Sequence, residues 1–268
     1  MSRQLLFYEK VVPVSKQRHT GWSIKTGSDY AFAKHVNSVP VVAVEFPNVA
    51  VEHPIVFAGE GEGMMPAVLL GMRDNENLYV NGSNGWDAKY IPAFIRRYPF
   101  VFSRSSDGAT FTLCIDEDFS GCNQENRGER LFDAEGERSQ YLENMLRFVN
   151  EYQGQYMRTQ LFCKKLQELD LLEPMQAQFT LNSGQRLRLA GFSAVNRERL
   201  KRLTDEQVSG LFKTDELELI YLHLQSMRNF NSMLERTANQ SSEQKLKRND
   251  SEEAASLEEA HPPKEGLH

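Results

Sequence analysis

The sequence has few cysteines and no long apolar run. Its three cysteines, Cys114, Cys122 and Cys163, are an odd number, and no two of them have the C-x-x-C spacing. This usage argues against a disulfide framework or a zinc site and fits a reducing compartment. No stretch approaches the roughly eighteen consecutive apolar residues of a membrane span, and the first residues lack the apolar core of a signal peptide. We therefore expect a cytoplasmic chain without a membrane span.

Positive charge is in the minority. The 268 residues include 31 Lys and Arg against 37 Asp and Glu, which gives a formal net charge of −6. A nucleic-acid-binding protein normally carries a basic stripe, so this balance argues against nucleic acid as a partner. The hydrophobic content of 40% is ordinary for a globular protein, and the length suffices for a sizeable core.

Motifs that carry catalysis or bind metals are also missing. The sequence contains neither an H-E-x-x-H pair for zinc nor a G-x-S-x-G nucleophile. Residues 116–121 resemble the start of a calcium loop, but Arg127 stands at the position where that loop needs a glutamate. The glycines of residues 59–63 (GEGEG) lack the spacing of a phosphate loop and predict a hairpin turn. We therefore expect no metal site and no cofactor.

Aromatic residues, in contrast, are concentrated in one stretch, residues 84–102 (NGWDAKYIPAFIRRYPFVF). The spacing predicts a helix over residues 86–97 that packs Trp86, Tyr90 and Phe94 as one face against a sheet. Each buried ring removes roughly 150–250 Å² from water, so we expect this stretch to form part of the core.

Two arginines in that stretch, Arg96 and Arg97, are the strongest candidates for a site. A guanidinium inside an aromatic cluster must be paired if it is buried. One arginine can be braced by Glu45 or Asp116, and the other can meet an anionic ligand; of these two roles we favour the structural one. Glu45 and His53 form an acid–base pair only if their elements converge. The candidate ligand-binding residues are Trp86, Tyr90, Arg96, Arg97, Glu45 and His53, and no catalytic residue is assigned.

The order of the predicted elements indicates an α+β fold. Residues 1–136 favour antiparallel strands, and residues 137–238 favour helices with one β-hairpin, turned by Asn182-Ser183-Gly184. A last long helix over residues 214–235 is expected to dock on the sheet, with His223 as a hydrogen-bonded core residue. We expect residues 1–238 to form one domain. The charged residues 239–268 predict a disordered acidic tail.

Several segments, in family order, resemble the SapC family of bacterial proteins. They are VEFPNVAVEHPIVF, LLGMRDNENLYV, WDAKYIPAFIRRYPF, RGERLFDAEGERS and LELIYLHLQSMRNF, and the resemblance covers residues 3–237. The family takes its name from an association with surface-layer export. The resemblance carries no catalytic signature, so no residue role follows from it. It implies flavin-dependent halogenase-like proteins, cupin-like oxygenases and outer-membrane TonB-dependent receptors as neighbours.

Two classes of function remain open at this point. The first is a non-catalytic accessory protein that binds a small ligand or a protein partner and is linked to outer-membrane uptake or surface-layer systems. The second is an enzyme, a hydrolase or one that modifies peptides or sugars, whose active site the sequence does not reveal. A binding protein predicts an apolar cleft, whereas an enzyme predicts titratable side chains that converge in the cleft.

Overall fold

A computed structural model of the chain describes residues 6–27, 29–104, 110–180, 184 and 186–240. Residues 241–268, which make up nearly all of the predicted tail, lie outside this part, as do Asn182 and Ser183 of the predicted turn. Helical backbone continues to residue 240, slightly beyond the predicted start of the tail.

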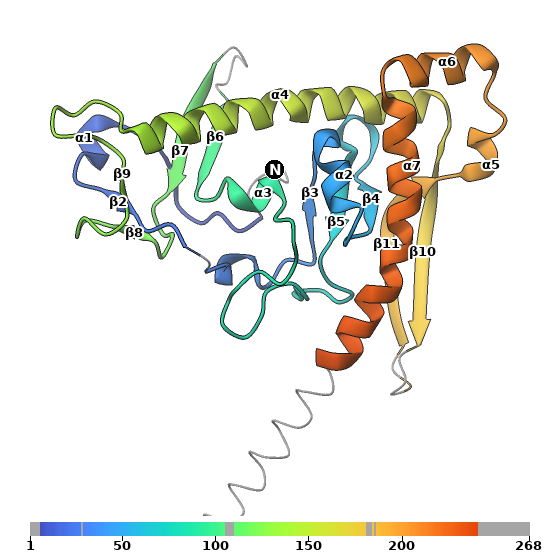
Figure 1. Cartoon of the computed structure of the whole chain (residues 1–268), viewed down its shortest axis with the longest axis horizontal. Helices are drawn as coiled ribbons and strands as arrows, with labels where there is room; N and C mark the ends of the chain where they lie inside the picture. The colour runs from blue at the N-terminus through green and yellow to red at the C-terminus, as the bar shows by residue number, and fades with distance from the viewer. Residues whose placement is uncertain (1–5, 28, 105–109, 181–183, 185, 241–268) are drawn as a thin grey trace, which may run out of the picture.

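The largest sheet has five antiparallel strands in the order β10-β11-β4-β5-β3 (Figure 1). Its strands are β3 (Ser38–Pro40), β4 (Ile55–Ala58), β5 (Met65–Leu69), β10 (Leu172–Thr180) and β11 (Arg186–Val195). The pairs β4–β5 and β10–β11 are the two hairpins that the glycine-bearing turns predict, so both hairpins are confirmed.

Two smaller antiparallel sheets have the orders β1-β7-β6 and β8-β2-β9. Their strands are β1 (Val11–Pro13), β2 (Ser23–Ile24), β6 (Phe100–Arg104), β7 (Phe111–Asp116), β8 (Cys122–Asn123) and β9 (Glu129–Arg130). Together with the helices below, these sheets confirm the predicted α+β class with a β-rich first half.

The longest helix is α4 (Gln140–Glu168), which runs along one edge of the molecule from the small sheets to the five-stranded sheet (Figure 1). Ser139 begins it, because the Ser139 hydroxyl accepts a hydrogen bond from the Leu142 amide. The other helices are α1 (Lys16–His19), α2 (Phe46–Val49), α3 (Ala93–Arg96), α5 (Arg197–Leu200), α6 (Asp205–Lys213) and α7 (Glu216–Ser226). None of the helices in the described ranges is both long and apolar enough to cross a membrane.

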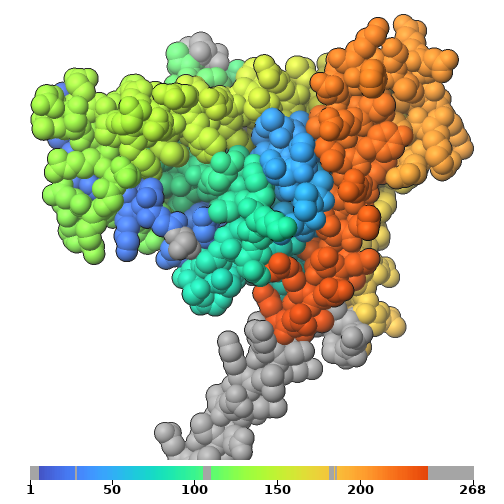
Figure 2. Space-filling view, in the orientation of Figure 1, coloured from blue at the N-terminus to red at the C-terminus, as the bar shows by residue number. Residues whose placement is uncertain are grey.

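Helix α7 docks on the five-stranded sheet through polar contacts within the core. The Ile55 amide donates to Ser226 Oγ at 2.9 Å. Buried His223 bridges two strands, because its Nδ1 lies 2.8 Å from the Ile55 carbonyl oxygen and its Nε2 accepts from the Val195 amide at 3.0 Å. The predictions of a docked helix and a hydrogen-bonded core histidine are therefore confirmed. Figure 2 shows that the segment around α2 (blue) lies between α4 and α7.

The predicted helix over residues 86–97 is wrong. Helix α3 begins only at Ala93, because Pro92 has no N–H to donate and holds an extended backbone with φ −53° and ψ 140°. Trp86 instead forms an isolated antiparallel bridge with Val80. Trp86, Tyr90 and Phe94 therefore do not share a helical face, although Phe94 is fully buried as expected.

The last predicted helix is also interrupted at its start. Thr214 does not cap it, since the Thr214 hydroxyl donates back to the Gly210 carbonyl at the end of α6. Asp215 follows in the left-handed region with φ +59°, and α7 begins after it. A 3₁₀ turn over Met227–Asn229 then separates α7 from the helical residues 230–240.

Candidate functional site

The larger cavity is a cleft of about 790 Å³ over the five-stranded sheet. Residues paired across antiparallel strands point to the same face, so the strand register defines the floor of the cleft. Phe57, on the opposite face, packs with its ring centroid 5.0 Å from that of His223, so α7 covers that side. The floor residues form two rows, Pro40-Ala67-Val56 and Met65-Ala58-Phe192.

Side chains from three distant segments complete the cleft. Leu6, Phe94 and Tyr156 line it from the N-terminal segment, α3 and α4. Its polar lining residues include Ser38 on β3 and Glu60 in the β4–β5 turn. Among the described residues that line it there is no Lys, Arg or His. Such a surface suits an apolar, uncharged molecule rather than an anion.

A second cavity, of about 400 Å³, lies between α3, α4 and the segment after β2. Aromatic rings form much of its wall: Phe32 stacks on Tyr98 at a centroid distance of 4.3 Å, and Phe119 meets Tyr98 edge-on at 5.1 Å. Arg96 and Lys25 supply positive charge to the same wall. We call this cavity the Arg96 pocket.

Arg96 is exposed and held from one side. Its Nε donates to the Ile91 carbonyl at 2.9 Å, and its Nη2 donates to the Tyr90 hydroxyl at 3.1 Å. The guanidinium also lies 5.5 Å from the Tyr90 ring centroid and 5.3 Å from that of Phe148. A guanidinium has five N–H donors, so described residues engage two of them and three remain available.

The Tyr90 hydroxyl links Arg96 to a buried carboxylate, that of Glu45. It donates to Glu45 Oε1 at 2.9 Å, and the same carboxylate accepts from the amides of Ala93 at 2.7 Å and Val42 at 2.9 Å. Burial raises the pKa of Glu45, and these hydrogen bonds offset part of the rise. Glu45 thus braces Arg96 through Tyr90, where the sequence predicted direct contact.

Replacing Tyr90 with phenylalanine tests this relay. The Tyr90→Phe protein is expected to lose about 1 kcal/mol of unfolding free energy, because Glu45 loses one donor in a buried position. Urea denaturation at neutral pH measures the change. Tyr221→Phe is the matched control, since Tyr221 is exposed and has no hydrogen bond to a described residue. Equal stability of both variants would show that the relay contributes nothing.

Arg97 occupies a different environment from its neighbour. Its side chain is buried, and the guanidinium lies 4.3 Å from the Phe94 ring centroid, 4.8 Å from that of Tyr152 and 5.8 Å from that of Tyr8. Arg97 lines neither cavity. Arg96, the last residue of α3, is therefore exposed, whereas Arg97, the residue after it, is buried in the core.

Trp86 and His53 lie in a third group. The His53 ring is buried 4.3 Å from the Tyr79 ring, and Trp86 donates through Nε1 to the Tyr90 carbonyl at 3.0 Å. The acid–base pair of Glu45 and His53 is not formed. The Glu45 carboxylate caps the start of α3, and no described residue makes a well-aligned hydrogen bond to either nitrogen of His53.

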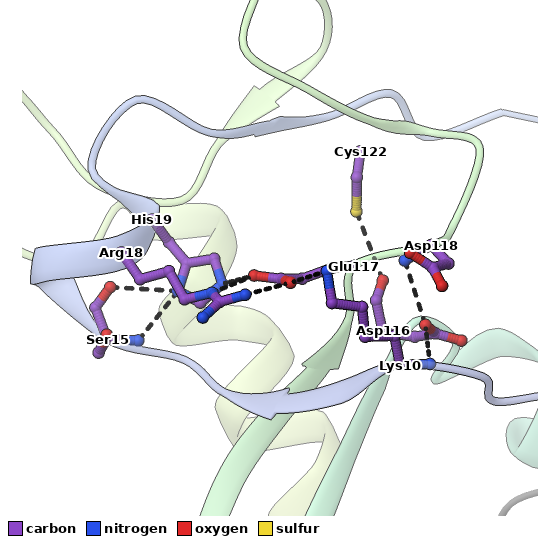
Figure 3. A network of polar contacts seen from close by, with 8 residues as sticks. All are labelled: Lys10, Ser15, Arg18, His19, Asp116, Glu117, Asp118 and Cys122. Atoms are coloured by element: carbon purple, nitrogen blue, oxygen red, sulfur yellow. Dashed lines mark hydrogen bonds and ion pairs between the residues drawn. The ribbon is translucent and has the colours of Figure 1, made fainter.

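A polar network joins the N-terminal segment to the end of β7 (Figure 3). Both carboxylate oxygens of buried Glu117 accept a hydrogen bond from Arg18, and the bond from Arg18 Nη2 is 2.6 Å long. Lys10 Nζ forms an ion pair with the same carboxylate at 3.0 Å. His19 Nε2 lies 3.3 Å from the same carboxylate. The hydrogen bonds from Arg18 lower the pKa of Glu117 to about 2. The network ties strands together and lines neither cavity.

Asp116, the first residue of the calcium-like segment, is part of this network. Its carboxylate accepts from the amides of Glu9 and Lys10, each at 2.9 Å, and from Tyr98 Oη at 3.2 Å. These donors orient the carboxylate toward the backbone. Across the described ranges, no group of three or more His, Cys, Asp or Glu side chains is arranged to hold a metal ion.

The family model described as SapC matches residues 14–233 of the chain. The chain belongs to the SapC family. No curated protein and no solved structure matches it.

For this SapC chain, sequence reasoning found Arg96, Tyr90 and Glu45, which the structure joins in one relay. It missed Tyr156, Phe192 and Tyr141, which line the two cavities. Tyr156 and Tyr141 sit on α4 and look like ordinary residues of an amphipathic helix. Only the docking of α4 on the sheets reveals that they face cavities.

Proposed function

We propose that this SapC protein is a non-catalytic binding protein for an uncharged, elongated apolar molecule. The observation that carries the proposal is the cleft over the five-stranded sheet. Its volume of about 790 Å³ lies within the range of roughly 300–1,000 Å³ that is typical of ligand sites.

The shape of the cleft supports an elongated ligand. Its floor crosses β3, β5, β4 and β11 in turn. Neighbouring strands lie about 4.8 Å apart, so these three steps span roughly 14 Å. A medium-length alkyl chain laid across the strands fits this span, and its burial would contribute about 0.8 kcal/mol for each CH₂ group.

The ionisable side chains in the lining favour binding over catalysis. Those among the described lining residues are Glu60, in the exposed hairpin turn, and Tyr156, on α4. Neither forms an ion pair with another lining residue. An enzyme needs a positioned acid, base or nucleophile, which this pair of separated groups does not supply.

Dodecanol is a suitable probe, and filling the cleft is the test. Ala67→Phe on the floor and Ala190→Phe at the exposed rim are each expected to weaken dodecanol binding about tenfold or more, equivalent to ~1.4 kcal/mol, because the added ring occupies the ligand's space. Titration calorimetry measures the affinity.

Ala134→Phe is the control, since it adds the same ring at an exposed position that does not line the cleft. It is expected to bind dodecanol like the parent. Parent-like binding by a folded Ala190→Phe protein, or no saturable binding of dodecanol by the parent, would rule out the cleft as the site.

The proposal also covers the cellular setting in which the ligand is bound. We place the protein in the cytoplasm, as an accessory to outer-membrane uptake or surface-layer systems. Flavin-dependent halogenase-like or cupin-like proteins are the partners to which it would deliver or present its ligand. The family resemblance supports this setting, and the cleft supplies the binding chemistry.

A further inference from the structure

We propose that the Arg96 pocket is a second binding site, specific for a small aromatic carboxylate. This site is separate from the cleft and does not depend on the function proposed for it. The two cavities share no lining residue, and their chemistry differs.

The guanidinium of Arg96 supplies the recognition of charge. Three of its N–H donors remain after the bonds to Ile91 and Tyr90, and a planar fork of donors matches a carboxylate. The bond to the Tyr90 hydroxyl, which Glu45 anchors in turn, fixes the position of the fork before a ligand arrives. A preorganised donor loses less entropy on binding.

The rest of the wall supplies the recognition of a ring. Phe32, Tyr98 and Phe119 already contact one another, so their faces and edges are held in place. Tyr30 and Tyr141 add two further aromatic rings to the lining. Aromatic side chains attract a π-system through stacked and edge-on contacts, each contributing beyond its buried area.

The charges around the pocket favour one negative charge over two. Lys25 adds a second cation at the exposed margin, whereas Asp29 brings a carboxylate to the same margin. The two cations and one carboxylate leave the lining with a net charge of +1, which one negative charge on the ligand balances. The volume of about 400 Å³ suits a ligand of one or two rings.

Phenylacetate and indoleacetate are the probes, with phenylacetamide as the uncharged analogue. The parent protein is expected to bind both carboxylates saturably and phenylacetamide at least about tenfold more weakly, since a charge-assisted bond is about twice as strong as a neutral one. Arg96→Gln is expected to remove this preference, so that phenylacetate and phenylacetamide bind equally weakly. Titration calorimetry gives the affinities.

Two further variants keep the test sharp. Arg147→Gln makes the same charge change on the exposed face of α4 outside the pocket, and is expected to bind phenylacetate like the parent. Ser120→Trp adds a large side chain at the exposed rim of the pocket and leaves Arg96 in the sequence. It is expected to weaken binding of all three probes. The proposal is overturned if the parent binds neither carboxylate, if Arg96→Gln keeps the preference for phenylacetate, or if Arg147→Gln loses it to the same extent. Dodecanol binding, measured in parallel, reports on the cleft alone.

Discussion

Phe94→Ala is expected to lower the unfolding free energy by about 3–5 kcal/mol, the range for truncating a buried aromatic ring. Phe94 is fully buried, and its ring centroid lies 5.5 Å from that of Phe7. The Arg97 guanidinium rests 4.3 Å from its ring centroid. Truncation therefore opens a void and also removes the π-surface that faces a buried cation. Urea denaturation followed by fluorescence measures the loss.

Phe212→Ala is the control for this prediction. Phe212 is the most exposed of the large apolar side chains in the described residues, at 71%. Its truncation is expected to change the unfolding free energy by no more than about 0.5 kcal/mol. If Phe94→Ala were as stable as Phe212→Ala, the aromatic stretch would not be the core element that its burial indicates.

Mild acid is expected to destabilise the protein through its buried histidines, chiefly His53 and His223, and His19 adds to the effect because burial lowers its pKa as well. Burial lowers the pKa of His53 and that of His223 to about 4 each, from an ordinary value of 6.5. The unfolded chain therefore takes up protons first as the pH falls, so stability is complete above pH 6.5 and is lost between 6.5 and 4. Each histidine accounts for about 3 kcal/mol over that window. Burial raises the pKa of Glu45, which offsets part of this loss.

The physical reason is clearest at His223. Its Nε2 accepts a hydrogen bond from the Val195 amide, so a proton there would place two N–H groups against each other. Replacing His223 would also leave the Val195 amide and the Ile55 carbonyl without partners, which confounds a test.

His53→Phe is the better variant to test the acid prediction. The phenyl ring keeps the packing on Tyr79 and removes the titration. Urea denaturation at a series of pH values from about 7.5 to 4.5 should show a clearly shallower pH slope than that of the parent, because one of the histidines whose pKa is lowered by burial is gone. The stabilisation from Glu117 starts to be lost only near the ordinary pKa of 4.5, so that carboxylate adds to the slope only at the acid end of this window. An unchanged slope would exclude His53 as a source of the acid sensitivity.

Local sequence signals predicted the elements that local interactions determine. Thr204 and Gln207 form a capping box at the start of α6, and Ser139 caps α4; both are residue types that favour a helix start. A helix over residues 86–97 does not form because Pro92, which has no N–H to donate, overrides the apolar spacing. The cavities could not be predicted, since β11 joins β4 across more than a hundred residues of intervening chain. The sequence identified Arg96 and Arg97 together as candidates for a site. Only the fold shows that Arg96 lines a pocket and that Arg97 is buried in the core.

Helix α4 connects the two cavities, because its residues line both of them. Tyr141 and Met145 on this helix line the Arg96 pocket, and Tyr156 lines the cleft, eleven residues or roughly 16 Å further along. A rigid rod shared by two sites transmits displacement between them, and any effect of one occupant on the affinity for the other is equal in both directions. Gly154, the residue with the weakest helix propensity in α4, lies between the two sites. Any displacement carried along α4 from one site to the other would have to pass Gly154.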